Sequence, residues 1–202
     1  RGKTRLKCYI LVFTCLTVRA IHLEATNGMK TPAVINAISR FCDVRGVPSK
    51  IISDNQTSFH KADKTLIEWY NSVDWDQVER VTGFGYRPQQ RGIEWIFNPP
   101  RAPHFGGIYE IMVKATKRAL LHCLVRADLA FDEFQTTVSK VAMLINNRPI
   151  QYKIDHRTAE PRVLTPNDFL LPQPSHVVFP PEVPEETTRG FDKRLKLSLI
   201  HI

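Results

Sequence analysis

The sequence predicts a mixed α/β fold, with a central sheet flanked by helices. Two strand-like runs open the chain, at Cys8 to Leu16 and Val18 to Thr26, and two long helical patterns occupy Ile108 to Arg126 and Phe131 to Asn146. Strands and helices mixed in this way form layered domains around one core. A chain of 202 residues that is 43% hydrophobic is long enough for one such domain and a tail.

The first two runs are expected to form neighbouring antiparallel strands. Cys8 to Leu16 is rich in β-branched and aromatic residues and contains no Gly or Pro, a pattern typical of a strand buried on both faces. Val18 to Thr26 alternates along its length, as expected for a second strand.

A helix and a short strand are expected next. Thr31 is the predicted N-cap and Pro32 the first helical residue, and Gly46 marks the end of the helix. Lys50 to Ser53 has the pattern of a short buried strand, and Asp54 follows it directly. The Asp54 carboxylate is therefore expected at the carboxyl edge of a sheet, where open α/β sheets commonly bind ligands.

The rest of the chain mixes elements and loops. We expect a helix at Ala62 to Tyr70, a strand at Ile93 to Asn98 and a stiff loop at Pro99 to Gly107. A Pro-rich stretch, Pro172 to Pro184, excludes a regular element.

Charge, hydropathy and cysteine content indicate the class of partner and the cellular compartment. Lys and Arg total 28 against 20 for Asp and Glu, giving a net charge of +8, which favours polyanions and nucleic acid first. No apolar run approaches the roughly 18 residues that span a membrane, so no membrane partner is expected. The four cysteines form no CxxC pair, which is typical of reduced thiols in an intracellular protein.

Two acids stand out as candidates for metal-dependent chemistry. Asp54 ends a strand, and Glu110 lies in the first turn of a helix directly after a Gly-Gly loop. Clustered carboxylates suit Mg²⁺, and paired metals catalyse phosphodiester chemistry. The alternatives are that Asp54 only forms a turn and that Glu110 only complements the helix dipole.

The helix after Glu110 carries two lysines on nearly the same face, Lys114 and Lys117, at about 100° per residue. Such a face can bind phosphates through its ammonium groups. The alternative is a surface Glu-Lys pair that only stabilises the helix. The opposite, packing face is predicted to contain Met112, Ala115, Ala119 and Cys123.

Five segments occur in a specific order across residues 7 to 171: LVFTCLTVRAIHLE, RGVPSKIISDNQTSF, IEWIFNPPRAPHFGGIYEIMVKATKRAL, INNRPI and LTPNDFLL. Together they resemble the integrase catalytic core of BEL/Pao-type LTR retrotransposons, which is similar to retroviral integrases. The resemblance implies an RNase H-like fold and a DDE-type enzyme that trims DNA 3′ ends and joins them to target DNA with Mg²⁺ or Mn²⁺. It also implies a homo-oligomer that acts on DNA in the nucleus.

The resemblance assigns roles to individual residues. Asp54 and Glu110 correspond to the second and third catalytic, metal-binding acids. Lys114, Lys117 and Asn55 correspond to DNA-binding residues. Glu94 also follows a Gly-containing loop, but it lies inside a strand pattern and opens no helix, so Glu110 is preferred.

Two of the chain's departures from the family pattern bear on the catalytic site. No acid precedes Glu24, so the first catalytic Asp is missing and its strand is truncated to a stub at residues 1 to 6. Gln56 stands where the family has Gly, and Gln is strained there if the backbone needs a positive φ. We therefore expect no strand transfer by this chain alone.

The expected organisation is an N-terminally incomplete core at residues 1–171, a Pro-rich linker at 172–196 and a sequencing-adaptor artefact at 197–202. One alternative function is a non-catalytic nucleic-acid-binding relic or a domesticated integrase-like protein. A weaker alternative is another RNase H-like nuclease, such as a ribonuclease H.

Overall fold

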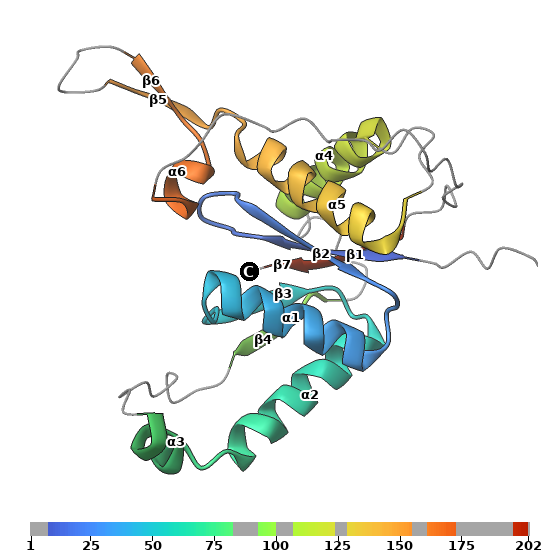
Figure 1. Ribbon diagram of the computed structural model, residues 1–202, viewed down its shortest axis with the longest axis vertical. Coiled ribbons are helices and arrows are strands. Elements are labelled where there is room, and N and C mark those ends of the chain that lie inside the picture. The colour runs from blue at the N-terminus through green and yellow to red at the C-terminus, as the bar shows by residue number, and fades with distance from the viewer. Residues whose placement is uncertain are drawn as a thin grey trace, which may run out of the picture.

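A five-stranded sheet with helices on both faces forms the body of the structure, a computed structural model that describes residues 8–82, 93–99, 107–123, 129–154, 161–172 and 196–201 (Figure 1). This arrangement confirms the mixed α/β prediction. The described elements are, in chain order, β1 (Tyr9–Thr14), β2 (Ile21–Thr26), α1 (Thr31–Arg45), β3 (Lys50–Ser53), α2 (Thr57–Ser72), α3 (Trp75–Thr82), β4 (Glu94–Phe97), α4 (Gly107–Cys123), α5 (Phe131–Asn146), β5 (Gln151–Ile154), β6 (Pro161–Leu164), α6 (Asn167–Leu170) and β7 (Lys196–His201).

The strands of the main sheet lie in the order β2-β1-β7-β3-β4. β1 and β2 are antiparallel, as predicted, and β3 and β4 are parallel. β7 lies between these two pairs, parallel to β1 over six residue pairs and antiparallel to β3 over two. The central strand, β7, thus comes after all the other described strands in the sequence.

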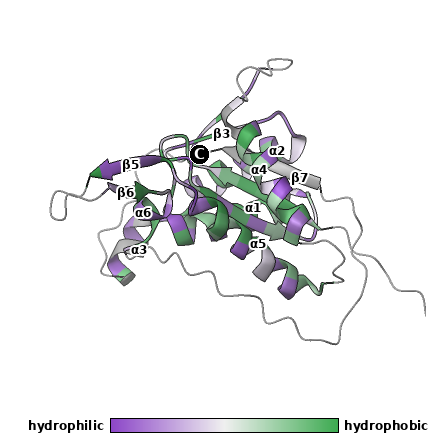
Figure 2. Cartoon of the chain, turned by 90° about the horizontal axis from the view of Figure 1, so that it is seen from above, coloured by the Kyte–Doolittle hydropathy of each residue, from purple (hydrophilic) through white to green (hydrophobic). Residues whose placement is uncertain are grey.

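Alternating side chains of β1 build two cores, one on each face of the sheet. Ile10 and Val12 pack with α4 and α5, whereas Leu11 and Phe13 pack with α1 and α2. All four side chains are at most 1% exposed, which confirms a strand buried on both faces. Figure 2 shows green, hydrophobic residues in the strands at the centre of the molecule and purple and green residues alternating along the helices.

Helix α1 begins and ends close to the predicted positions, but its cap differs. Thr31 is already helical, and Lys30 occupies the cap position without a side-chain hydrogen bond, so the predicted Thr31 cap is wrong. Pro32 supplies the start because its fixed φ suits the first turn and its missing N–H has no helical partner to lose. Gly46 ends the helix with φ 85°, and its N–H donates to the Cys42 carbonyl.

Polar residues at the end of α5 fasten it to the turn before β2. The Asn146 amide accepts from the Ile21 N–H and donates to the Ile21 carbonyl, both at 2.8 Å, and Asn146 is only 1% exposed. Arg148 donates to the carbonyls of Ile145 and Arg19. Arg19 has a positive φ of 57°, so the guanidinium holds a turn of unusual conformation. The INNRPI segment therefore has a structural role here.

The LTPNDF segment forms the short helix α6, which contacts the end of α5. Asp168 accepts hydrogen bonds from the Thr165 N–H at 2.7 Å and hydroxyl at 2.8 Å, which stabilise the first turn. Asn167 is 2% exposed and donates to the Asn147 side chain, so α6 is tied to the end of α5. The sequence analysis predicted no element at β5, β6 or α6.

Several predictions concern residues outside the described ranges, including the strand stub at residues 1 to 6 and nearly all of the 172–196 linker. The adaptor origin of residues 197–202 concerns the nucleotide sequence and stays a prediction; in the structure, Lys196–His201 forms β7. Within the described part of the chain, no helix combines the length and the hydropathy required to cross a bilayer.

Candidate nucleic-acid interface and acidic site

Asp54 lies at the surface directly after the buried strand β3, where the sequence places it. Ser53, the last residue of β3, is fully buried, and its hydroxyl accepts from the Trp95 indole at 2.8 Å. Protein atoms displace part of the water around Asp54, which raises the pKa of its carboxyl. The Gln56 N–H donates a hydrogen bond to Oδ1 of Asp54 at 3.2 Å, and this bond opposes the rise. The fold thus holds an exposed carboxylate at a strand end, and partial desolvation raises its pKa.

Asn55 and Gln56 connect β3 to helix α2. The Asn55 amide donates to the Asn98 carbonyl at 2.5 Å, which ties the end of β3 to the residue after β4. Gln56 has φ −66° and ψ 131° and occupies the N-cap position of α2. This is ordinary extended backbone, so the strain considered for Gln56 in place of Gly does not arise.

Glu110 lies in the first turn of α4 and is exposed, as predicted. Its carboxylate is 3.0 Å from the Lys114 ammonium, in an i,i+4 pair whose side chains are 56% and 71% exposed. An ion pair this exposed contributes little to stability, so it leaves Lys114 available to another anion. Glu94 lies in β4 and pairs with Lys50 at 3.0 Å, in agreement with its exclusion as a helix-opening acid.

The packing face of α4 differs in part from the predicted one. Met112, Thr116 and Leu120 are buried, and the Thr116 hydroxyl donates to the Met112 carbonyl at 2.8 Å. Cys123 was expected on this face but is exposed. The opposite face is therefore open to solvent along most of the helix.

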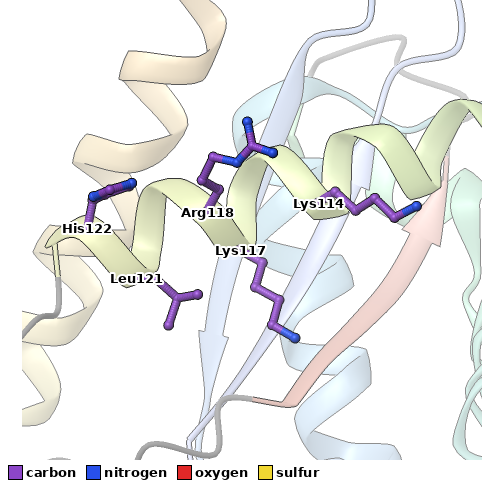
Figure 3. Close-up of a pocket in the computed structure, with 5 residues that line it drawn as sticks. All are labelled: Lys114, Lys117, Arg118, Leu121 and His122. Atoms are coloured by element: carbon purple, nitrogen blue, oxygen red, sulfur yellow. The ribbon is translucent and has the colours of Figure 1, made fainter.

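A hollow of about 530 Å³ lies along this open face; Lys114, Lys117, Arg118, Leu121 and His122 line it, mostly with their apolar side-chain atoms. Figure 3 shows Arg118 and His122 on one side of α4 and Lys117 and Leu121 on the other. We call this set the α4 basic face. The sequence analysis named its two lysines but missed Arg118 and His122, although the i,i+4 spacing of 114, 118 and 122 was a usable signal.

The two candidate acids do not form a complete metal site within the described residues. No group of three or more His, Cys, Asp or Glu side chains among them is placed to hold a metal ion. β7, the neighbour of β3 on the side toward β1, has the sequence KLSLIH and carries no acid. A pair of divalent metals normally requires several carboxylates, so these residues alone do not fit the Mg²⁺ pair that the resemblance implies.

Comparison with known proteins gives distant structural similarities only. No protein-family model matches the chain, and no curated protein matches it. The catalytic core domain of HTLV-2 integrase, solved with magnesium in a trimeric form, is similar with a TM-score of 0.47 and 12% identity, over 85% of this chain and 100% of that one. A simian T-cell lymphotropic virus intasome, in complex with PP2A regulatory subunit B56 gamma, contains a chain that is similar with a TM-score of 0.48 and 15% identity, over 94% of this chain and 62% of that one.

Proposed function

We propose that this chain is part of the catalytic core of a BEL/Pao-type retrotransposon integrase with an RNase H-like fold, and that it binds DNA through the α4 basic face. The observation that carries the proposal is this face itself. Four basic side chains project from a helix whose other face is buried in the core, and the helix opens with a candidate catalytic acid. The five family segments of the sequence support the same assignment.

The α4 basic face suits a phosphate backbone better than a small anion. Its Lys, Arg and His side chains extend over about two turns of a rigid helix, from 114 to 122, so they follow a row of phosphates instead of converging on one point. The hollow is open, and its one apolar residue, Leu121, is 51% exposed. Binding of this kind is driven largely by release of counterions from the nucleic acid.

Asp54 and Glu110 are proposed as the second and third acids of the DDE set. With a further carboxylate upstream, they would hold Mg²⁺ or Mn²⁺, which activates the attacking oxygen and stabilises the leaving one. Asn55 is proposed to contact DNA beside Asp54, with its amide already positioned by the Asn98 carbonyl. The enzyme would act as a homo-oligomer on DNA in the nucleus.

The alternative, a non-catalytic nucleic-acid-binding relic, is favoured for the chain as given by one observation. Among the described residues, no three His, Cys, Asp or Glu side chains are placed to hold a metal ion. Both candidates predict DNA binding, and they differ only in strand transfer.

DNA binding is tested by fluorescence anisotropy on a duplex between about 50 and 200 mM salt. Replacing Lys114, Lys117 and Arg118 with Ala should weaken binding and reduce the slope of log K against log salt by about 0.9 for each lost phosphate contact. Lys64→Ala is the matched control, since Lys64 is 79% exposed and pairs with Glu68 on α2. Equal losses in the triple variant and the control would rule out the α4 basic face as the DNA site.

Catalysis is tested by extending the coding sequence upstream of Arg1. If an in-frame strand with an Asp is present, the extended protein should show Mg²⁺-dependent strand transfer. Asp54→Asn and Glu110→Gln should each abolish it, whereas Glu94→Gln should retain it because Glu94 only pairs with Lys50. A stop codon, or a strand without a carboxylate, would leave the non-catalytic alternative.

A further inference from the structure

Two arginines lie together where the turn between β1 and β2 meets the end of α5 (Figure 1). Arg19 belongs to the turn, Arg148 follows α5, and both side chains are partly buried. Arg148 donates one hydrogen bond to the Ile145 carbonyl at 2.8 Å and another to the Arg19 carbonyl. Its guanidinium is therefore held between the two elements. We call Arg19 and Arg148 the arginine pair.

The arginine pair has no negative partner in the part of the chain that the structure describes. The ion pairs formed there involve other residues. Burial lowers the pKa of Arg148, and the positive charge of Arg19 lowers it further, with no carboxylate acting in the opposite direction. Two like charges that are partly removed from water repel each other, so an anion placed between them would be strongly attracted.

One amino group of the pair is buried without a hydrogen-bond partner. Nη1 of Arg19 is enclosed by protein and meets no acceptor among the described residues. Nearly all buried polar groups of folded proteins are hydrogen-bonded, and an exception calls for a specific explanation, such as a catalytic role or a bound ion. The Arg19 side chain is long and has many rotamers, so its guanidinium can turn toward an acceptor that approaches from the solvent side.

The backbone of the turn fixes the position of Arg19. Its φ of 57° is unfavourable for a residue with a Cβ. The Arg19 N–H donates to the Cys15 carbonyl at 2.9 Å, and the Cys15 N–H donates to the Ala20 carbonyl at 2.8 Å, which closes the turn around this conformation. Backbone strain of this kind clusters at ligand-binding and active sites, where it holds a side chain in place before the ligand arrives.

We propose that the arginine pair binds a single phosphate group. Guanidinium groups recognise phosphate oxygens through paired, charge-assisted N–H donors, which a lysine ammonium group cannot arrange in the same way. Two adjacent guanidinium charges match the one to two negative charges of a phosphate. The site differs from the α4 basic face, because its charges come from a turn and from the end of α5 and do not follow one helix. It does not depend on DNA binding by that face.

Thermal unfolding in a phosphate-free buffer near neutral pH, with inorganic phosphate added at constant ionic strength, tests the proposal. A ligand that binds only the folded state stabilises it, so about 20 mM phosphate should raise the melting temperature of the wild type by about 4 °C for a dissociation constant near 1 mM. Arg19→Gln should lose this rise. Without phosphate it should be at least as stable as the wild type, because it removes one of two repelling charges. If Arg19→Gln does not fold, Arg19→Lys replaces it and should reduce the rise, since it keeps the charge but lacks the paired donors.

Duplex DNA distinguishes the source of the phosphate group. In an anisotropy titration, a slope of log K against log salt that is smaller by about 0.9 in Arg19→Gln than in the wild type would assign the arginine pair to a phosphodiester of DNA. An unchanged slope, together with loss of the phosphate-dependent rise in melting temperature, would assign the pair to free phosphate. Both results support a phosphate site.

Arg45→Gln is the matched control, because Arg45 lies in the last turn of α1 and no second arginine affects its pKa. It should keep the phosphate-dependent rise. The variant with Ala at Lys114, Lys117 and Arg118 should keep it as well, so the result is separable from the test of the α4 basic face. No rise in the wild type, an equal rise in Arg19→Gln, or loss of the rise in either control would each overturn the proposal.

Discussion

Asn146 offers the most direct test of how the end of α5 is fastened to the sheet. Its amide makes two hydrogen bonds with the backbone of Ile21, both at 2.8 Å, in a position that water does not reach. Asn146→Ala would leave a buried N–H and a buried carbonyl without partners. Each unsatisfied group costs about 1–3 kcal/mol, so we expect a total loss of about 3–4 kcal/mol after partial relaxation.

That loss is large compared with the 5–15 kcal/mol typical of a folded domain, and it corresponds to a fall in melting temperature of roughly 10 °C. Urea unfolding followed by circular dichroism measures it. Thr136→Ala is the matched control, because the Thr136 hydroxyl bonds the Asp132 carbonyl at 2.9 Å on the exposed side of the same helix. It should change stability by no more than about 0.5 kcal/mol. An Asn146→Ala variant within about 1 kcal/mol of the wild type would refute the argument.

Two further predictions concern ionisable side chains. Burial alone would raise the pKa of the Glu24 carboxyl, but hydrogen bonds from His22 and Arg40 outweigh burial and lower it below 4.5. The ionised carboxylate therefore stabilises the fold above that pH and ceases to do so as pH falls through its lowered pKa, so urea midpoints measured from pH 7 to 3 should fall less steeply in Glu24→Gln; equal slopes would contradict this. Burial and the neighbouring Asp43 raise the pKa of the Cys42 thiol to about 11, whereas Cys123 is exposed. Iodoacetamide at pH 8 should therefore label Cys123 well before Cys42. Peptide mass spectrometry can follow the labelling, and the reverse order would contradict the exposed position of Cys123 at the end of α4.

Local sequence patterns predicted the elements whose structure depends on residues within the same segment. The strand Lys50–Ser53 and the helix Phe131–Asn146 match their predicted bounds, because an apolar run in one and helical periodicity in the other act within the segment. Strands β5 and β6 were not predicted, because their apolar residues are exposed and not buried against a core, and β6 begins with Pro161. The position of β7 depends on strands more than 140 residues away, which no local pattern encodes.

The candidate site was predictable where one residue type and one position sufficed. Asp54 at a strand end and Glu110 in a first helical turn were both located correctly. The backbone conformation of Gln56 was not predictable, because the Gly that the family has at this position can adopt either a positive or a negative φ. The spacing of Glu110 and Lys114 predicted either a surface ion pair or a phosphate-binding face, and only the side-chain positions show the ion pair.

The central position of β7 also sets the order in which the sheet can be completed. Tyr9 of β1 pairs with Lys196, so the centre of the sheet closes only after the ribosome has added a further 187 residues. At about 5–20 residues per second, that takes roughly 10–40 s, during which β7 is not yet present to pair with β1 and β3. Unpaired strand edges pair readily with other chains, so nascent copies on one transcript are exposed to misassembly until β7 arrives.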